Sequence, residues 1–360
     1  MKTSKKSSAF SWQRLSLIIL CVCLGIVLTA LISATAYINH LLSFITIDPN
    51  SNSNSNISID GTLSSDVMAT ATDETLDPTL DYSGPSIDPS EVTLATLPPF
   101  TPAEELIVDG VINIMLVGED RRPGEDRQRS DSMILCSFNT NNNTLNMISF
   151  LRDTYVVIPG YNGNKLNAPY QWGGVSLLDR TMALNFGVHV DANVVVNFDG
   201  FMSIIDMLGG VDISLTLAEA DHLNEVYGWN LTAGMQHLDG RKALAYSRIR
   251  KIDWDINRTQ RQRNVLIALI NSFKDESLVS MTAIVSNIVQ SGYVQTDMSS
   301  SELTGYITKL FPMLSSAKIN NYHIPATNTF TDMSVGHLVD VKVCDLETNR
   351  AILKKIFGVG

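Results

Sequence analysis

The chain has 360 residues, of which 44% are hydrophobic and 18% are charged, and its formal net charge at pH 7 is −11. A chain of this length and composition buries one or two cores, which excludes a wholly disordered protein. Charge is unevenly distributed: residues 1–14 carry +4, residues 48–110 carry −12, and residues 111–360 carry −3 from 22 basic and 25 acidic side chains. The last part is nearly neutral, which argues against general nucleic-acid binding.

An uncharged apolar stretch covers residues 15–38 (LSLIILCVCLGIVLTALISATAYI). Its 24 residues would span about 36 Å as a helix, enough to cross a bilayer with some tilt. The basic residues that precede it are Lys2, Lys5, Lys6 and Arg14. No other Lys or Arg occurs before Arg121. By the positive-inside rule we expect residues 1–14 in the cytoplasm, one transmembrane helix at 15–38, and an extracytoplasmic remainder of a cell-membrane protein.

A cleaved signal peptide is the alternative for this stretch, because Ala34-Thr35-Ala36 fits a small-residue cleavage site. The apolar run, however, exceeds the usual hydrophobic region of about 7 to 15 residues. Its length therefore favours an uncleaved anchor.

Residues 39–110 are predicted to form a disordered tether. Between residues 48 and 110 there are twelve acidic residues and no basic one, together with the repeat SNSNSN and many Ser, Thr and Pro. A segment of low hydrophobicity with charge of one sign cannot bury enough apolar surface to offset the loss of chain entropy on folding. We therefore expect the folded domain to cover residues 111–360.

Segments with strand-like and helix-like patterns alternate in this domain. Short runs rich in β-branched residues predict buried strands at residues 111–118, 132–138, 144–151, 192–198 and 318–324. Apolar residues at helical spacing predict helices at residues 176–187, 199–210, 258–273, 278–290, 301–314 and 346–357. The alternation predicts an α/β fold with a sheet layered between helices.

The four cysteines give no disulfide framework. Cys21 and Cys23 lie in the apolar stretch, whereas Cys136 and Cys344 lie in apolar contexts of the domain. Two buried thiols fit this pattern best, and one bridge between Cys136 and Cys344 stays open for an extracytoplasmic domain.

Two carboxylates and one arginine are placed at predicted strand ends. Asp120 follows the first strand, Asp131 opens the second, and Arg152 follows the third. If the first two strands are neighbours, the carboxylates meet at one sheet edge, where they would share a hard cation such as Mg²⁺ with substrate phosphate oxygens. Alternatively, both are ordinary turn residues.

The stretch RIRKIDWDINRTQRQR, residues 248–263, holds six of the 26 basic residues. Arg258 and Gln262 are four residues apart at the start of a predicted helix and share one face. Positive charge is unfavourable at a helix N-terminus because of the helix dipole, so arginines there indicate an anion that neutralises them. Guanidinium groups match phosphate oxygens bidentately. A solvated basic face paired with Asp253 and Asp255 is the alternative.

Seven stretches taken together resemble the LytR-CpsA-Psr family over nearly all of residues 111–273. The stretches are LVGEDRR, RSDSMIL, SFLRDTYVVIPG, KLNAPYQWGG, VNFDGFMSIIDMLGGVDI, HLDGRKALAYSRIRK and DINRTQRQR. The resemblance implies a membrane-anchored α/β/α sandwich with a mixed central sheet, which binds a polyprenyl pyrophosphate through arginines and Mg²⁺. It further implies transfer of a phosphoglycan to a cell-wall hydroxyl, typically C6 of muramic acid in peptidoglycan.

The same resemblance implies roles for individual residues. The implied catalytic residues are Arg152, Arg248, Arg250, Arg258 and Asp255. The implied substrate-binding residues are Arg122, Lys165, Arg261 and Gln262. Asp120 and Asp131 would hold the metal, and Asp153 would hold Arg152. The residues that would line a channel for the lipid tail, or else form ordinary core, are Val194, Val196, Phe198, Phe201, Ile205, Leu266 and Ile270.

Two other functions remain open at this point. The same site would suit a polyprenyl-pyrophosphate hydrolase, in which water replaces the glycan hydroxyl. A non-catalytic lipid-binding regulator of the envelope is the alternative from a different class. The sequence contains no H-E-x-x-H, C-x-x-C or G-x-S-x-G motif that would point to a metalloprotease, a dithiol enzyme or an α/β-hydrolase.

Overall fold

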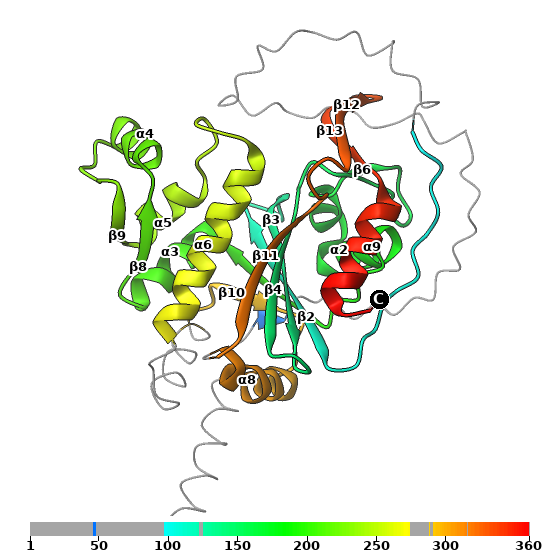
Figure 1. The fold of residues 1–360 in the computed structure, drawn as a ribbon, viewed down its shortest axis with the longest axis horizontal. Helices are drawn as coiled ribbons and strands as arrows, with labels where there is room; N and C mark the ends of the chain where they lie inside the picture. Colours follow the sequence, from blue (N-terminus) through cyan, green and yellow to red (C-terminus); the bar gives the residue numbers. More distant parts are fainter. Residues whose placement is uncertain are drawn as a thin grey trace, which may run out of the picture.

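A computed structural model describes residues 46–47, 97–121, 125–273, 288, 291–314 and 316–359. Within these residues, seven strands form one central sheet (Figure 1). In spatial order they are β1 (Thr46–Ile47), β10 (Val294–Thr296), β7 (Ala192–Asn197), β2 (Val111–Glu119), β3 (Ser130–Asn139), β4 (Thr144–Phe150) and β11 (Lys318–Ile324). The pairs β2–β7 and β4–β11 are parallel, whereas β2–β3 and β3–β4 are antiparallel. The predicted α/β fold is confirmed, and its central sheet is mixed.

The other described elements are three two-stranded sheets and a set of helices. The sheets pair β5 (Tyr155–Val156) with β6 (Asn164–Lys165), β8 (Val211–Leu215) with β9 (Gly234–Leu238), and β12 (Phe330–Val335) with β13 (Leu338–Cys344). The first and last pairs are hairpins, whereas a helix separates β8 from β9 in the chain. The helices are α2 (Ala168–Phe186), α3 (Phe198–Met207), α4 (Leu217–Tyr227), α5 (Gly240–Ser247), α6 (Asp255–Phe273), α8 (Ser300–Leu314) and α9 (Leu346–Phe357).

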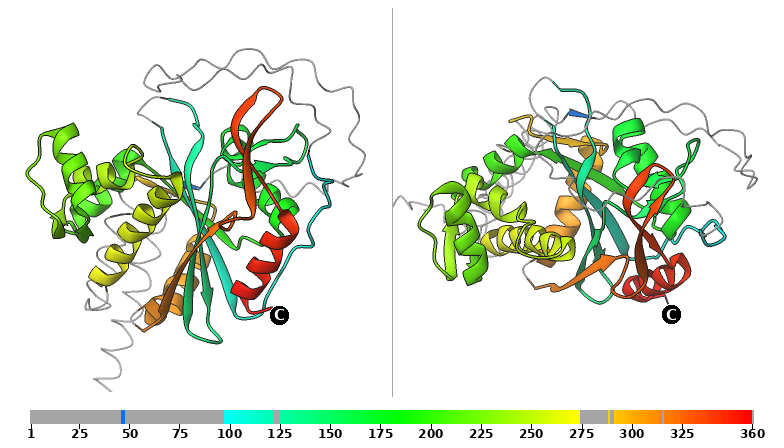
Figure 2. Two further views of the ribbon diagram at one scale, coloured as in Figure 1. Left: turned by 45° about the horizontal axis from the view of Figure 1, so that its top comes forward. Right: turned by 90° about the horizontal axis from the view of Figure 1, so that it is seen from above.

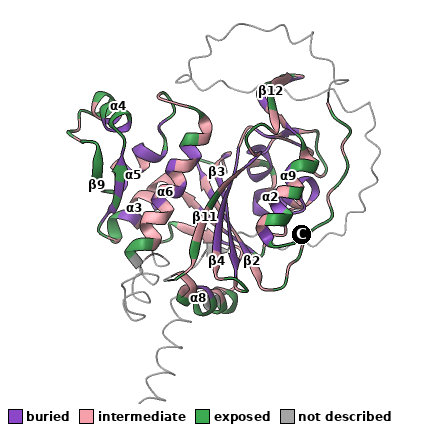
Figure 3. Cartoon of the chain, in the orientation of Figure 1, coloured by how far each residue is buried: buried purple, intermediate pink, exposed green. Residues whose placement is uncertain are grey.

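Helices cover both faces of the sheet (Figures 1 and 2). Alternate strand residues point to opposite faces, so Met115 and Val117 of β2 join one core with α2 and α9, while Ile114 and Leu116 face the other side. On that second side, Leu266 of α6 and residues of α8 pack under the sheet. The central strands are accordingly the most buried part of the molecule (Figure 3).

A side lobe, residues 198–247, projects from the second face and contains α3, β8, α4, β9 and α5. Its core is a separate cluster that includes Ile205, Leu223 and Tyr246. The approach of α5 to α3 requires Gly240, because a Cβ there would lie 2.2 Å from the carbonyl oxygen of Met202. The lobe packs against α6 through β8 and α5, and a cavity separates it from the sheet.

The strands β2, β3, β4, β7 and β11 and the helices α3, α6, α8 and α9 lie where the sequence predicts them. The predicted helix at 176–187 is longer at its N-terminus, because α2 already begins at Ala168. Gly173 and Gly174 interrupt it with non-helical dihedral angles, and the φ of +66° at Gly174 suits glycine. Because these adjacent glycines interrupt the helical spacing of apolar residues, the first part of α2 is not predicted from the sequence.

The folded domain begins before residue 111. Ala103 N donates to Leu184 O at 2.8 Å and Leu106 N to Gly187 O at 2.9 Å, while Leu106 and Val108 pack against the core. A few apolar residues at the end of an acidic segment are thus sufficient for docking, which average composition does not show.

Most of the expected N-terminal organisation lies outside the described residues. This applies to the cytoplasmic end at 1–14, to the anchor at 15–38 and, apart from residues 46–47 and 97–110, to the tether. None of the helices in the described part of the chain has the length and hydropathy needed for a membrane span.

Cys136 and Cys344 are both free and buried. They belong to the cores on opposite faces of the sheet, so packing keeps them apart. Burial raises the pKa of each thiol to about 12. Of the two possibilities that the sequence left open, the structure contains the buried thiols.

Candidate functional site

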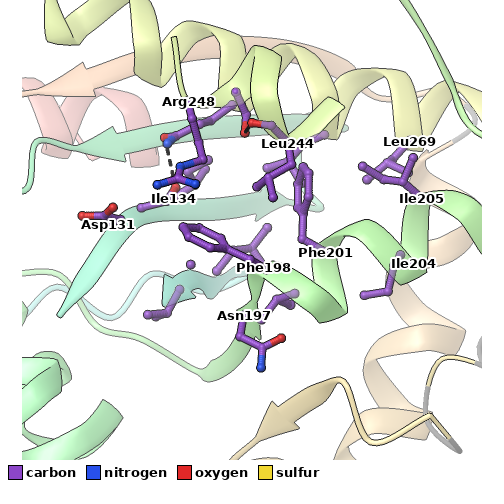
Figure 4. Close-up of a pocket in the computed structure, with 18 of the residues that line it drawn as sticks. Asp131, Ile134, Asn197, Phe198, Phe201, Ile204, Ile205, Leu244, Arg248 and Leu269 are labelled. Atoms are coloured by element: carbon purple, nitrogen blue, oxygen red, sulfur yellow. Dashed lines mark hydrogen bonds between the residues drawn. The ribbon is translucent and has the colours of Figure 1, made fainter. Parts of the chain in front are cut away.

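A cavity of about 260 Å³ opens between the sheet, the side lobe and α6 (Figure 4). Its apolar lining residues are Leu116, Val117, Ile134, Val194, Val196, Phe198, Phe201, Ile204, Ile205, Leu244, Leu266 and Leu269. Its charged and amide lining residues are Asp131, Asn197, Arg248, Arg250, Arg258 and Gln262. In the close-up Asp131 and Arg248 lie at one end, whereas Ile204, Ile205 and Leu269 lie at the other. The cavity thus joins a charged end to an apolar interior.

The predicted channel residues separate into two groups. Six of the seven line this cavity, whereas Ile270 packs into the core between α6 and the sheet. Helical geometry explains the difference: Leu266 and Leu269 face the cavity, and the next position along α6 turns away from it.

A bulge at the start of β3 positions Asp131. Gly118 pairs with Ser132, but the next residue, Glu119, pairs with Ser130, so Asp131 is the extra residue. In regular strands neighbouring side chains point to opposite faces, yet Asp131 and Ser132 both line the cavity. The bulge therefore turns the carboxylate toward the charged end of the site.

Arg152, which follows β4, contacts this carboxylate directly. Its Nη1 donates to Asp131 Oδ1 at 2.6 Å, and Arg250 Nη2 lies 3.6 Å from Asp131 Oδ2. Burial raises the pKa of Asp131, but the charges of Arg152, Arg250 and Arg258 outweigh burial and lower it. Asp131 is therefore ionised at neutral pH.

Asp153 connects Arg152 to Lys165 of β6. Its carboxylate oxygens lie 3.4 Å from Arg152 Nε and 3.0 Å from Lys165 Nζ. Burial raises the pKa of Asp153, and the charges of Arg152 and Lys165 more than compensate, so the pKa is lowered. The predicted role of Asp153 in holding Arg152 agrees with this geometry.

Arg258 lies on the first turns of α6 with 3% of its side chain exposed. Its Nη2 contacts Asp255 Oδ1 at 2.8 Å, but its Nε and Nη1 are buried and have no hydrogen-bond partner among the described residues. Burial lowers the pKa of Arg258 to about 10, and Arg152 and Arg250 add to the shift against the opposing charge of Asp255. The site has an excess of positive charge that suits an anion.

Arg248 and Gln262 complete the charged end of the cavity. The Arg248 guanidinium carbon lies 4.3 Å from the ring centroid of Phe198, a cation–π contact that holds the side chain over the cavity. Gln262 Oε1 accepts a hydrogen bond from Ser132 Oγ at 3.1 Å. Ser132 could not be predicted as a site residue, because its place in the cavity depends on the bulge beside it.

Arg261 is not part of this cavity. Its Nε donates to Glu219 Oε1 at 2.7 Å, its Nη1 donates to Ile249 O at 3.2 Å and to Asp253, and its Nη2 donates to Asp253. These contacts tie α6 to the side lobe. Arg261 lies three positions after Arg258 on α6, and this offset around the helix directs its side chain to other partners. The structure therefore does not support the predicted substrate-binding role.

The remaining predicted residues are placed less directly. Asp120 follows β2 at the edge where Asp131 opens β3, but it does not line the cavity. Arg122 lies outside the described residues. Among the described residues no three His, Cys, Asp or Glu side chains group as metal ligands. A Mg²⁺ ion commonly uses only one or two carboxylates besides phosphate oxygens, which Asp131 and Asp120 can supply.

Comparison with known proteins gives the family. Residues 88–352 match the LytR_cpsA_psr family. The chain belongs to this family. Its relatives include the polyisoprenyl-teichoic acid–peptidoglycan teichoic acid transferase TagU of Oceanobacillus iheyensis, 36% identical over 205 residues, which are 55% of this chain and 62% of TagU. The regulatory protein MsrR of Staphylococcus aureus strain COL is 30% identical over 250 residues, 68% of this chain and 74% of MsrR. The chain thus spans about three fifths of TagU.

Solved structures of the family share this fold. TagT of B. subtilis has a TM-score of 0.56 at 28% identity, with 70% of this chain and 92% of TagT covered. The LytR-CPS2A-psr family protein YwtF (TagT) with bound octaprenyl pyrophosphate lipid has a TM-score of 0.53 at 27% identity. The match covers 70% of this chain and 92% of YwtF. The family resemblance inferred from the sequence motifs is therefore confirmed.

Proposed function

We propose that this chain transfers a phosphoglycan from a polyprenyl-pyrophosphate carrier to a hydroxyl of the cell wall, with C6 of peptidoglycan muramic acid as the acceptor. The relatives named TagU are polyisoprenyl-teichoic acid–peptidoglycan teichoic acid transferases, and one solved structure of the family holds octaprenyl pyrophosphate. The observation that carries the proposal here is the cavity, which joins an apolar interior to a cluster of arginines.

Each part of the lipid matches one part of this cavity. The side chains around Val196 and Phe201 offer the polyprenyl tail an apolar lining, worth about 0.8 kcal/mol per buried methylene group. The pyrophosphate would lie at the other end, where Nε and Nη1 of Arg258 have no partner among the described residues. A soluble phosphate compound would leave the apolar part without an occupant.

The arginines would act mainly through electrostatics and positioning. In phosphoryl transfer the charge on the equatorial and leaving oxygens grows toward the transition state, and fixed guanidinium groups stabilise it. Arg152 is fixed by Asp131 and Asp153, and Arg248 by the Phe198 ring. These contacts hold the donors in place before the substrate arrives, which lowers the reorganisation cost of the reaction.

Asp131, together with Asp120, would hold the Mg²⁺ ion. The ion would neutralise charge on the pyrophosphate oxygens when bound. The low pKa of Asp131 keeps the carboxylate ionised and available as a ligand. No histidine is among the described residues that line the cavity, and the loose transition state of phosphoryl transfer requires little assistance from a general base.

The proposed location follows from the N-terminal sequence. A single helix at residues 15–38 would anchor the chain in the cell membrane, with the domain outside the cytoplasm, where both the lipid carrier and peptidoglycan are accessible. A tether then allows the domain to reach the wall.

A transfer assay tests the proposal directly. Full-length protein in detergent is incubated with a lipid-linked glycan donor, Mg²⁺ and soluble peptidoglycan fragments, and the products are analysed by mass spectrometry. A phosphodiester between the glycan and muramic acid is the expected product. Glycan phosphate released into water would instead show a hydrolase, and unchanged donor would favour a lipid-binding regulator.

A further inference from the structure

An exposed aromatic pair, Tyr161 and Trp172, lies outside the three hydrophobic cores. The two residues expose 51% and 38% of their surface, and their ring centroids are 5.0 Å apart with an angle of 35° between the ring planes. Tyr161 comes from the tip of the β5–β6 hairpin and Trp172 from the first part of α2. Two large rings from separate elements thus form a joint surface that solvent reaches.

Local features constrain the backbone segments that carry the two rings. Tyr161 N donates to Ile158 O at 3.0 Å in the hairpin turn. A Cβ at Gly163 would lie 2.1 Å from Tyr155 Oη, so the hairpin backbone at Gly163 packs closely against the side chain of Tyr155. Trp172 precedes the glycine break in α2, which ends the first helical segment. A preformed surface of this kind binds a ligand with little loss of conformational entropy.

Both elements that carry the pair are connected to the proposed catalytic site. Asn167 N donates to Arg152 O at 3.1 Å, and Ser130 N donates to Asn167 O at 3.4 Å, so the start of α2 is attached to Arg152 and to the beginning of β3. The hairpin supplies Lys165, which contacts Asp153 at 3.0 Å. The aromatic pair therefore lies on two elements that are both attached to residues of the charged end.

The geometry of phosphoryl transfer indicates the side from which the acceptor approaches. The attacking and leaving oxygens lie roughly in line on opposite sides of the phosphorus. In the proposed reaction the leaving polyprenyl phosphate lies in the cavity, on the face of the sheet that α6 covers. The acceptor hydroxyl must approach the phosphorus from the side away from the cavity, over the edge of the sheet. The elements that contact Arg152 and Asp153 at this edge and pack on the sheet face away from the cavity are α2 and the β5–β6 hairpin.

The chemistry of the pair matches a saccharide. A pyranose ring has a face of C–H groups and a rim of hydroxyls, so it suits aromatic rings that stand beside polar groups. Asn162 and Gln171 adjoin the two rings in the chain. We propose that Tyr161 and Trp172 stack against a pyranose ring of the acceptor glycan. This assignment rests on the proposed function, since it is the transfer reaction that requires an acceptor.

Direct binding tests the assignment without requiring catalysis. Soluble peptidoglycan glycan strands without a lipid are titrated into full-length protein in detergent, and the Kd is measured by calorimetry. We expect Trp172→Ala and Tyr161→Ala each to weaken binding by about tenfold, whereas Trp172→Phe and Tyr161→Phe retain most of it because they keep a ring. Unchanged affinity in both alanine variants would overturn the proposal.

A second exposed pair gives a matched control. Tyr227 and Trp229 stack with centroids 4.5 Å apart on the side lobe, and Tyr227 is 44% exposed. Tyr227→Ala should leave glycan binding unchanged. A loss equal to that of Trp172→Ala would show that exposed aromatic rings bind the strands without a specific site, which contradicts the assignment.

Steady-state kinetics separate this assignment from the proposed function. Trp172→Ala should raise the KM for the acceptor about tenfold and leave the KM for the lipid donor unchanged. A rise in the donor KM alone would place the donor glycan, not the acceptor, on the pair and overturn the proposal. If the unaltered chain binds strands through Trp172 but transfers nothing, the proposed reaction fails while the saccharide site stands.

Discussion

Arg152 Nη1 donates a hydrogen bond of 2.6 Å to Asp131 Oδ1, so a proposed phosphate ligand and a proposed metal ligand are in direct contact. Arg250 lies on the other carboxylate oxygen at 3.6 Å. The single negative charge of Asp131 therefore balances part of the positive charge that the pyrophosphate would meet. A bound metal ion and a bound anion would share these partners between them.

Replacing Asp131 with Asn should separate anion binding from transfer. The amide keeps one oxygen for Arg152 but removes the negative charge, so pyrophosphate binding in EDTA should tighten by roughly 1 kcal/mol, about fivefold. Mg²⁺-dependent transfer should fall by at least about a hundredfold, because the amide is a poor Mg²⁺ ligand. Calorimetry with inorganic pyrophosphate and the transfer assay measure the two effects. Weaker anion binding in EDTA would contradict the charge argument.

Removing Arg258 should weaken lipid pyrophosphate binding by roughly 1.5 to 3 kcal/mol without lowering the stability of the fold. Two of its nitrogens are buried without a partner among the described residues, and its lowered pKa shows that folding disfavours its charge. The melting temperature of Arg258→Ala should therefore equal or exceed that of the unaltered chain. Arg258→Lys should restore only part of the binding, since it lacks the guanidinium fork.

Arg261 provides the matched contrast on the same helix. It is as buried as Arg258, with 4% of its side chain exposed, but it is paired with two carboxylates, Glu219 and Asp253, whereas Arg258 is paired with one, Asp255. Arg261→Ala leaves two acidic groups without their partner and should lower the free energy of unfolding by about 3 to 5 kcal/mol. Urea denaturation of both variants measures the difference. Equal destabilisation by the two alanine substitutions would refute the assignment of a structural role to Arg261 alone.

Filling the cavity should affect the lipid tail and not the head group. Val196 lines the apolar part, so Val196→Trp should reduce thermal stabilisation by a long-chain polyprenyl pyrophosphate, while stabilisation by inorganic pyrophosphate stays unchanged. A ligand at 100 times its Kd stabilises the unaltered chain by about 2.7 kcal/mol, which is measurable as a thermal shift. Val196→Ala, which enlarges the cavity, serves as the control. Equal stabilisation by short and long chains in the unaltered protein would exclude a tail site.

Asp179 of α2 should make stability depend on pH. Its Oδ2 accepts from Asn193 Nδ2 at 2.8 Å, but its Oδ1 is buried without a partner among the described residues. Burial raises the pKa of Asp179 well above 3.8, the Asn193 hydrogen bond opposes this, and the charges of Asp297 and Glu105 add to it. The folded state then holds this proton more tightly than the unfolded state, so stability falls as pH rises above about 3.8.

Asp179→Asn removes that titration and keeps an oxygen for Asn193. The variant should gain stability relative to the unaltered chain as pH increases, and urea denaturation from about pH 4 to about pH 8 measures the gain. Asp221→Asn, an exposed carboxylate on α4, should show no such trend. Parallel stability curves for the Asp179→Asn variant and the unaltered chain would contradict the prediction.

The sequence alone determined the family, the mixed α/β character and most of the charged end of the site. Local patterns suffice for these features, because periodicity fixes strands and helices and the arginines near Arg258 stand in short motifs. Helical spacing also places Arg258 and Gln262 on one face, as the structure has them. Such information lies within a few neighbouring residues and needs no knowledge of packing.

The tertiary structure decided which residues meet. Arg258 and Arg261 are three residues apart and look alike in sequence, yet one faces the cavity and the other is bound by Glu219 of the side lobe. Asp131 faces the site because a bulge adds one residue to β3. The aromatic pair likewise joins residues from a hairpin and a helix. Side-chain direction and partner choice depend on contacts between segments distant in the chain, and no local pattern of residues records those contacts.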